Sequence, residues 1–286
     1  MFVTPLLRRL ARLPGLRRLR RHERVARVAD ALYYARLVEE QTRFFVGELL
    51  RRPAVGRYRP RNARLDVFVR HQTSDRYILD EIFGVGLYEL PAGAKTSLAG
   101  VARPRALDLG AHIGLFGAFF LSRFPRGELD AFEPDPGNAE LLERCVAASG
   151  LAARWRVIRA AAAAADGRAL LLAGRYAESQ VTLGASGAID VDARDVFPFL
   201  ATAHLVKIDV EGSEWAILGD PRFERIDARV VALEYHPQGC PEPDPRTAAI
   251  TLFDRLGYVV EEVDIAHAPA GVGMLWAWRA TSGSPV

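Results

Sequence analysis

The sequence contains little cysteine, almost no lysine and no long apolar run. Its only cysteines are Cys145 and Cys240, which excludes a disulfide framework and a zinc site made of cysteines alone, and favours a reducing compartment. Its only lysines are Lys95 and Lys207, so arginine carries nearly all of the positive charge. No stretch of 18 apolar residues occurs, and arginines interrupt the N-terminal leucines where a secretory signal would need an apolar core. We therefore expect a cytoplasmic protein without a transmembrane helix, with at most peripheral membrane contact.

The positive charge is concentrated at the N-terminus. Residues 1–64 hold 17 arginines and 5 acidic residues, which gives them a net charge of +12. The whole chain of 286 residues has a net charge of +3, so the remaining residues have a net charge of −9. A basic head before an acidic body indicates an anionic partner for the head. The body itself is not expected to bind nucleic acid.

Leucines and arginines alternate in the head in a pattern typical of an amphipathic helix. Pro14-Gly15 divides residues 1–27 into two short helices, and residues 23–52 are predicted to form one longer helix. Such a basic amphipathic segment either lies on an anionic lipid surface or packs against its own protein with the arginines in solvent. Both interpretations are compatible with the sequence.

The body alternates strands and helices, which is typical of an α/β fold with a mostly parallel sheet. A strand over 65–70 and a helical segment over 75–90 lead into it. The predicted strands are 106–110, 128–134, 154–161, 204–210, 229–236, 258–264 and 273–280. The predicted helices are 115–124, 136–149, 213–218 and 245–256. Between them, Asp166-Gly167 predicts a hairpin turn in a small antiparallel insertion around 160–190. The predicted divisions are a helical extension (1–64), a lead-in covering the cofactor site (65–104) and the main domain (105–286).

A glycine turn follows the first strand of the body. The segment ALDLGAHIG (106–114) runs from an apolar strand into a helix and lacks the GxGxxG spacing of nicotinamide and flavin enzymes. Glycines at this place let a ligand approach the backbone, and the helix start offers unpaired N–H groups. The alternative is a purely structural turn.

An acidic residue ends the second strand of the body. Glu133 stands 25 residues after Asp108, where a carboxylate can accept hydrogen bonds from both hydroxyls of a ribose. An exposed loop carboxylate is the alternative. Together with the glycine turn, Glu133 indicates a nucleoside-binding half of the sheet.

Charged residues crowd the end of the strand at 204–210. Strands buried on both faces are normally continuous apolar runs, whereas this one carries Lys207 and Asp209 and is followed by Glu211 and Glu214. A salt-bridge cluster is one interpretation, and a polar cluster facing a ligand cleft is the other. His236 ends the next strand at the same rim and titrates near neutrality, as a general base must.

Taken together, these motifs resemble the FkbM family of S-adenosylmethionine-dependent methyltransferases. The resemblance runs from about Asp75 to His236 and is carried by LDLGAHIGLFG, AFEPDPGNAELLERCVAASG, VKIDVEGSEWAILGD and ALEYHP. It implies a class I methyltransferase fold, which is a Rossmann-like seven-stranded sheet whose last two strands are antiparallel. It also implies S-adenosylmethionine as cofactor, with the residues Asp108, Gly110, His112, Gly114, Glu133 and Asp209 in its site. His112 departs from the family, in which asparagine is usual.

The resemblance also implies O-methyl transfer to a hydroxyl of a sugar, glycolipid or polyketide-type natural product. The candidate catalytic residues are His236, Glu211 and Asp209 as bases, with Lys207 polarising the cluster. Asp209, Glu211 and Glu214 together can also be expected to hold Mg²⁺, although we favour a metal-independent reaction. The acceptor would be chosen by the segments around 50–95 and 166–190 and by the loop after His236, with residues such as Arg70 in contact with a hydroxylated substrate.

Two further functions are compatible with such a fold. One is a nucleic-acid methyltransferase guided by the basic head. The acidic body and the absence of an NPPY or cysteine-nucleophile motif argue against it. The other is a cofactor-binding module without catalytic activity.

Overall fold

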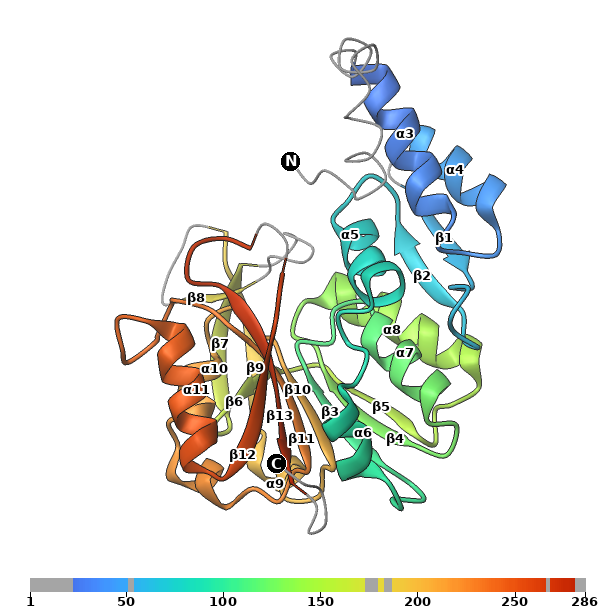
Figure 1. The fold of residues 1–286 in the computed structure, drawn as a ribbon. Helices are drawn as coiled ribbons and strands as arrows, with labels where there is room; N and C mark the ends of the chain where they lie inside the picture. Colours follow the sequence, from blue (N-terminus) through green and yellow to red (C-terminus); the bar gives the residue numbers. More distant parts are fainter. Residues whose placement is uncertain (1–22, 51–53, 173–179, 183–186, 266–267, 281–286) are drawn as a thin grey trace, which may run out of the picture.

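The chain folds around one large sheet, with a helical N-terminal part packed beside it (Figure 1). The predicted short helices of the head lie outside the residues that the computed structural model describes, which are 23–50, 54–172, 180–182, 187–265 and 268–280. Within those residues, no helix is long and apolar enough to cross a membrane.

The central sheet has seven strands in the order β12-β13-β11-β10-β3-β4-β5. The neighbouring pairs from β11 to β5 are parallel, and β13 is antiparallel to both β11 and β12. This confirms the predicted seven-stranded sheet and its antiparallel last pair. The bounds are β3 Arg105–Leu109, β4 Glu128–Phe132, β5 Trp155–Ile158, β10 Leu205–Ile208, β11 Val230–Tyr235, β12 Tyr258–Val263 and β13 Gly273–Arg279.

Helices cover both faces of this sheet, and side-chain alternation along the strands gives each face its own core. In β3, Ala106 joins the core under one set of helices, while Leu107 and Leu109 join the core under the other. The first set comprises α6 (Ala92–Leu98), α7 (Leu115–Arg123) and α8 (Pro136–Ser149). The second comprises α9 (Phe197–Leu200), α10 (Glu214–Leu218), the 3₁₀ turn η3 (Pro221–Arg225) and α11 (Pro245–Arg255). Because both faces are covered, the carboxyl ends of the parallel strands are the open edge of the sheet.

The single helix predicted over 23–52 is wrong, because the chain forms α3 (Glu23–Ala35) and α4 (Gln41–Leu49). The residues between them bond to a distant segment instead of continuing the helix. Val38 forms a β-bridge with Pro60, and the N–H of Glu39 donates to the carbonyl of Arg59 at 2.9 Å. A tertiary contact therefore breaks a segment whose local pattern is helical.

A hairpin links the N-terminal helices to the main sheet. Strand β1 (Val55–Tyr58) pairs antiparallel with β2 (Val67–Arg70), so residues from the predicted extension and the predicted lead-in share one sheet. After β2 come α5 (Asp75–Asp80) and a π-helical turn, η1 (Glu81–Val85). The predicted helical segment over 75–90 is thus real but shorter and irregular, and π turns occur frequently at functional sites.

The predicted insertion forms a four-stranded sheet of order β6-β9-β7-β8. Its strands are β6 (Ala161–Ala163), β7 (Gly167–Leu172), β8 (Gln180–Thr182) and β9 (Ile189–Asp195). The long strand predicted over 154–161 ends at Ile158, and β6 starts in this second sheet. The hairpin predicted at Asp166-Gly167 is wrong, because β6 and β7 are not neighbours and both pair with β9.

Candidate active site

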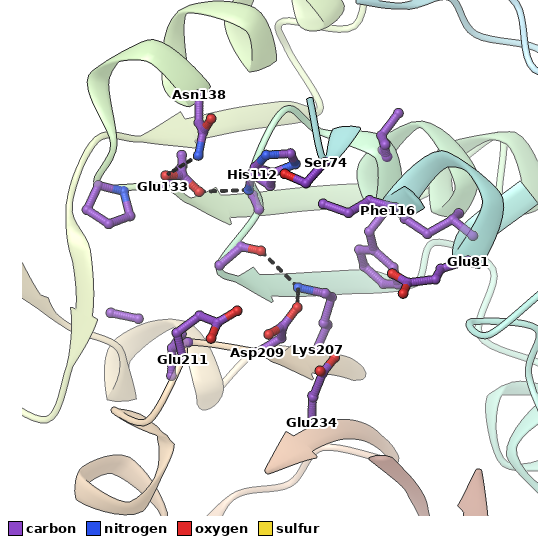
Figure 2. Close-up of a pocket in the computed structure, with 18 of the residues that line it drawn as sticks. Ser74, Glu81, His112, Phe116, Glu133, Asn138, Lys207, Asp209, Glu211 and Glu234 are labelled. Carbon is purple, nitrogen blue, oxygen red and sulfur yellow. Dashed lines mark hydrogen bonds and ion pairs between the residues drawn. The ribbon is translucent and has the colours of Figure 1, made fainter. Parts of the chain in front are cut away.

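A cavity of about 310 Å³ opens at the carboxyl ends of the parallel strands (Figure 2). This size falls within the range of small-molecule sites. Its wall combines the glycine turn after β3, the end of β4, the ends of β10 and β11, and the α5–η1 segment. Ala161, Ala162 and Leu171 of the insertion close one side. Of the predicted site residues, those that line the cavity are Gly110, His112, Glu133, Lys207, Asp209 and Glu211.

The glycine turn brings the backbone of two strands together. Gly110 has φ +83°, and a Cβ at this position would lie 1.8 Å from the carbonyl oxygen of Asp209. The N–H groups of Gly110 and Ala111 both donate to the carbonyl of Phe132, at 3.2 and 2.8 Å. Gly114 also has positive φ, and its Cβ would meet Leu142 at 2.5 Å. The turn therefore requires glycine for its own packing, which also keeps side-chain atoms out of the cavity.

Replacing Gly110 by alanine is expected to destabilise the protein by about 3 kcal/mol, because strain at positive φ adds to overpacking against Asp209. Gly150→Ala is the matched control: Gly150 has φ +67° but nothing within 4 Å of its Cβ. It should lose only about 1 kcal/mol. Urea unfolding of the two variants measures the difference, and equal losses would contradict this account of the turn.

Glu133 is buried and held by donors on both oxygens. Its Oε2 accepts the N–H of His112 at 2.7 Å, and its Oε1 accepts the N–H of Asp135 at 2.8 Å and the side-chain amide of Asn138 at 3.4 Å. Burial raises the pKa of Glu133 to about 7, although these hydrogen bonds oppose the rise. Each oxygen retains acceptor capacity toward the cavity. The carboxylate is thus fixed in place and lines a ligand site.

Lys207 is the cation at the centre of the strand ends. Its Nζ donates to the carbonyl of Gly110 at 2.8 Å and lies 3.3 Å from Asp108 and 3.2 Å from Asp209. Although burial opposes its charge, Asp209 and Asp108 raise the pKa of Lys207 above its usual range. Asp108 is completely buried behind the cavity wall. Among the described residues, its carboxylate accepts no hydrogen bond of normal geometry, and Lys207 is its ion-pair partner. Lys207 therefore forms ion pairs with one buried carboxylate and one cavity carboxylate.

Glu214 and His236 form a second buried pair beside the cavity. Glu214 Oε2 accepts the backbone N–H of Gly212 at 2.9 Å. Its Oε1 accepts the backbone N–H of His236 at 2.7 Å and lies 3.1 Å from Nδ1 of the same residue. Glu211 lies 3.5 Å from the other ring nitrogen. Burial alone would lower the pKa of His236, but Glu214, Asp209 and Glu211 together raise it to about 9. His236 is therefore an imidazolium near neutral pH, and Glu214 is a structural anchor.

The groups that converge for a metal ion differ from the predicted set. Among the described residues, ligand atoms of Asp209, Glu234 and His236 all lie within 4.8 Å of one another. Glu214 is committed to His236 and Gly212. The ammonium of Lys207 beside Asp209 and the positive charge on His236 both oppose a cation at this place.

Several residues of the cavity wall were not assigned to the site from the sequence. Glu81 of η1 and Glu234 of β11 face the Lys207–Asp209 pair in Figure 2, and Tyr88 lies in the same wall. Burial and the charge of Asp209 raise the pKa of Glu81 to about 7 and that of Glu234 well above its usual value. Neither side chain forms a hydrogen bond in the part of the chain that the structure describes. Glu234 was visible as a strand-end acid, but a π-helical turn cannot be read from sequence spacing.

This strand order, with β13 inserted antiparallel between β11 and β12 and a glycine turn after the central β3, defines a class I methyltransferase fold. The model of the methyltransferase FkbM domain matches residues 108–260, more than half of the chain. The chain therefore belongs to the FkbM methyltransferase family. A comparison with proteins of curated function finds no significant match.

The solved structures that this chain matches are distant from it in sequence. A methyltransferase FkbM from Methylobacillus flagellatus KT is 14% identical with a TM-score of 0.43, and the alignment covers 89% of this chain but only 59% of that one. A fibrillarin from Aeropyrum pernix, solved with bound S-adenosyl-L-methionine, is 17% identical over 65% of this chain and 73% of its own, with a TM-score of 0.37. An O-methyltransferase from Thermotoga maritima is 13% identical over 71% of each chain, with a TM-score of 0.39.

Proposed function

We propose that the protein is an S-adenosylmethionine-dependent O-methyltransferase acting on a hydroxyl of a sugar, a glycolipid or a polyketide-type natural product. The supporting observation is that one cavity joins two kinds of site. A buried carboxylate at the end of β4, Glu133, lies in the same wall as the carboxylate rim at the ends of β10 and β11. The first suits the ribose of a nucleoside cofactor, and the second suits a hydroxyl that must lose a proton.

The residues on the cofactor side fit this group. Glu133 would accept the ribose hydroxyls, while Gly110 and His112 would border the rest of the cofactor. The cofactor supplies an electrophilic methyl group on a sulfonium. The main work of the protein is then to align the acceptor oxygen with that methyl and to exclude water. The buried strand ends and the insertion, which closes one side of the cavity, would both help to align the acceptor and to exclude water.

On the acceptor side, a carboxylate is favoured over His236 as the base. A general base must be unprotonated, and the pKa of His236 is raised to about 9 by its carboxylate neighbours. Glu211 and Asp209 line the cavity, and Asp209 is partly neutralised by Lys207. Glu234 is less suited, because burial raises its pKa well above the usual value and favours the protonated form. We infer that one of the other two carboxylates accepts the hydroxyl proton, and that the charges of Lys207 and His236 hold the rim together.

Isothermal titration with S-adenosylmethionine, followed by a transfer assay with methyl-labelled cofactor, tests this function. The assay uses panels of sugars, glycolipids and aromatic polyketide alcohols, together with RNA and DNA, each with added Mg²⁺ or with EDTA. Binding with labelled product supports the proposal. Binding without transfer to any class indicates the non-catalytic module, and transfer only to RNA or DNA indicates a nucleic-acid methyltransferase. Loss of activity in EDTA would contradict the metal-independent reaction.

Alanine variants of Asp209, Glu211 and His236 are each expected to lower turnover by about 100-fold or more. This is the usual effect of removing a general base, or a charge that supports it. Cofactor affinity should change little, because Glu133 lies on the other side of the cavity. Glu261→Ala, at an exposed position of β12, is the control. Full activity in all three variants would contradict the assignment of the rim.

For the basic head, we propose peripheral contact with an anionic membrane. The supporting observation is the net charge of +12 in residues 1–64. Arginine-rich amphipathic segments bind anionic lipid surfaces in a salt-dependent way. Co-sedimentation of the full chain with phosphatidylglycerol vesicles at low salt, but not at high salt or with phosphatidylcholine alone, supports it. Absence of binding at low salt would contradict it.

A further inference from the structure

Arg70 connects the N-terminal hairpin to the cofactor side of the cavity. It ends β2, and its guanidinium forms a two-armed ion pair with the completely buried Asp75, Nε to Oδ2 and Nη2 to Oδ1, both at 2.9 Å. The same Nη2 donates to the side-chain oxygen of Asn138 at 2.7 Å and lies 3.1 Å from Nε2 of His112. One side chain from the lead-in thus meets two residues around Glu133.

Arg70 determines which way the amide of Asn138 points. A guanidinium has only donors, so the amide oxygen of Asn138 must face Arg70. The amide nitrogen then faces Glu133 Oε1, at 3.4 Å. Without Arg70 the amide oxygen loses the donor that faces it, and a turned amide would present this oxygen to the carboxylate of Glu133, which would be repulsive. Arg70 therefore secures one of the donors on Glu133.

Arg70 also determines the tautomer of His112. Nε2 of His112 lies 3.1 Å from Arg70 Nη2 and 3.5 Å from Asp75 Oδ1. The contact with Arg70 is the shorter one, and an N–H on Nε2 would point at the donors of Arg70, so we infer that the lone pair of Nε2 faces Arg70 and that the proton sits on Nδ1. Burial and the charge of Arg70 outweigh the opposite effect of Asp75 and lower the pKa of His112 to about 4, so the ring is neutral. The Nδ1 atom is buried without a hydrogen-bond partner in the described residues. This N–H is therefore available to donate a hydrogen bond to an acceptor atom of a ligand in the adjoining cavity.

The backbone at His112 completes the connection. His112 has φ +51°, and its N–H donates to Glu133 Oε2 at 2.7 Å. Arg70 therefore contacts both His112 and Asn138, each of which donates a hydrogen bond to the carboxylate of Glu133. Asp75 fixes the guanidinium in turn, because it also accepts the backbone N–H of Arg70 at 2.9 Å.

We propose that Arg70 is a positioning residue of the cofactor site, which orients Asn138 and the neutral Nδ1–H tautomer of His112 around Glu133. The connection between β2 and α5 is then a functional part of the cofactor site, in addition to the glycine turn and Glu133. The ligand concerned is the nucleoside cofactor, so the inference rests on the proposed function.

Cofactor titration of Arg70→Gln tests the proposal. The affinity for S-adenosylmethionine at pH 7.5 should fall at least tenfold. The pH at which affinity is half-lost should also rise, because Glu133 loses a donor that favours its ionised form while the charge of Asp135 nearby remains. Arg57→Gln is the matched control, since Arg57 lies in the same hairpin and pairs with Asp66 but is half exposed. Wild-type affinity and pH midpoint in Arg70→Gln would overturn the proposal.

Removing Arg70 leaves Asp75 buried and unpaired, so a variant that interrupts the connection elsewhere is needed. Asn138→Ala retains the Arg70–Asp75 pair and should also weaken cofactor binding at least tenfold, with a rise in the same pH midpoint. If Arg70→Gln does not fold, this variant decides, and unchanged affinity with an unchanged midpoint overturns the proposal.

A ligand-free measurement separates this inference from the proposed function. In ¹⁵N spectra of histidine-labelled protein, His112 should be the neutral Nδ1–H tautomer between pH 5 and 8, and Asn138→Ala should preserve it. An Nε2–H tautomer in the wild type overturns the inference. If the wild type does not bind S-adenosylmethionine but shows the Nδ1–H tautomer, the proposed function fails while the Arg70 geometry stands.

Discussion

Replacing Lys207 by methionine is expected to destabilise the protein by about 3–5 kcal/mol, the usual cost of leaving a buried charge without its partner. Asp108 is completely buried, and Lys207 is its only ion-pair partner among the described residues. The loss should be largest above neutral pH. At lower pH the unpaired Asp108, whose pKa is already raised by burial, takes up a proton and avoids the charge.

Urea unfolding between pH 5 and 9 measures this loss. Lys95→Met is the matched control, because the other lysine of the chain is exposed on α6 and should change stability by less than about 0.5 kcal/mol. Combining Lys207→Met with Asp108→Asn should recover part of the stability, since the second change removes the unpaired charge. A double variant less stable than the single variant would show that Asp108 is not the source of the loss.

The sequence predicted the central sheet well because its strands are mostly apolar and most of them are separated by helices. These are local patterns, and burial on both faces makes them strong. The failures occurred where a distant segment overrides the local pattern. Val38 bonds to Pro60 instead of continuing a helix, and β9 inserts between β6 and β7 where Asp166-Gly167 predicted a hairpin.

The candidate site was predictable in part for the same reason. Carboxyl ends of parallel strands meet at one edge, so Glu133, Lys207, Asp209 and Glu211 fall together once the strands are placed. The role of each residue was not predictable, because it depends on partners far away in the chain. His236 is an example, since its raised pKa follows from Glu214 and other carboxylates packed around it.

The lead-in was predicted to cover the cofactor site, but the particular contacts that it makes there were the least predictable feature. Arg70 lies 68 residues from Asn138 and 42 from His112, and no spacing rule connects them. Glu81 reaches the cavity through a π-helical turn. The cavity thus depends both on the central sheet and on a segment that precedes it in the chain.

Replacing Glu133 by glutamine is expected to weaken S-adenosylmethionine binding about 100-fold at pH 8. Two hydroxyl hydrogen bonds to a buried carboxylate contribute about 1.5 kcal/mol or more each, which corresponds to about two orders of magnitude together. Glu128→Gln is the control, because Glu128 begins the same strand at the far, half-exposed end.

The pH dependence of binding provides the sharper test of Glu133. Hydroxyl donors favour the carboxylate, so the cofactor binds the ionised form more tightly and lowers its pKa. In the free protein that pKa is raised by burial to about 7. Wild-type affinity should therefore fall by up to tenfold per unit as pH drops below 7 and level off above about 8. The glutamine variant resembles the protonated form and should lack this component. Titrations of the ligand itself are common to both proteins, so the difference between the two curves isolates Glu133. Parallel curves would show that Glu133 does not bind the ribose.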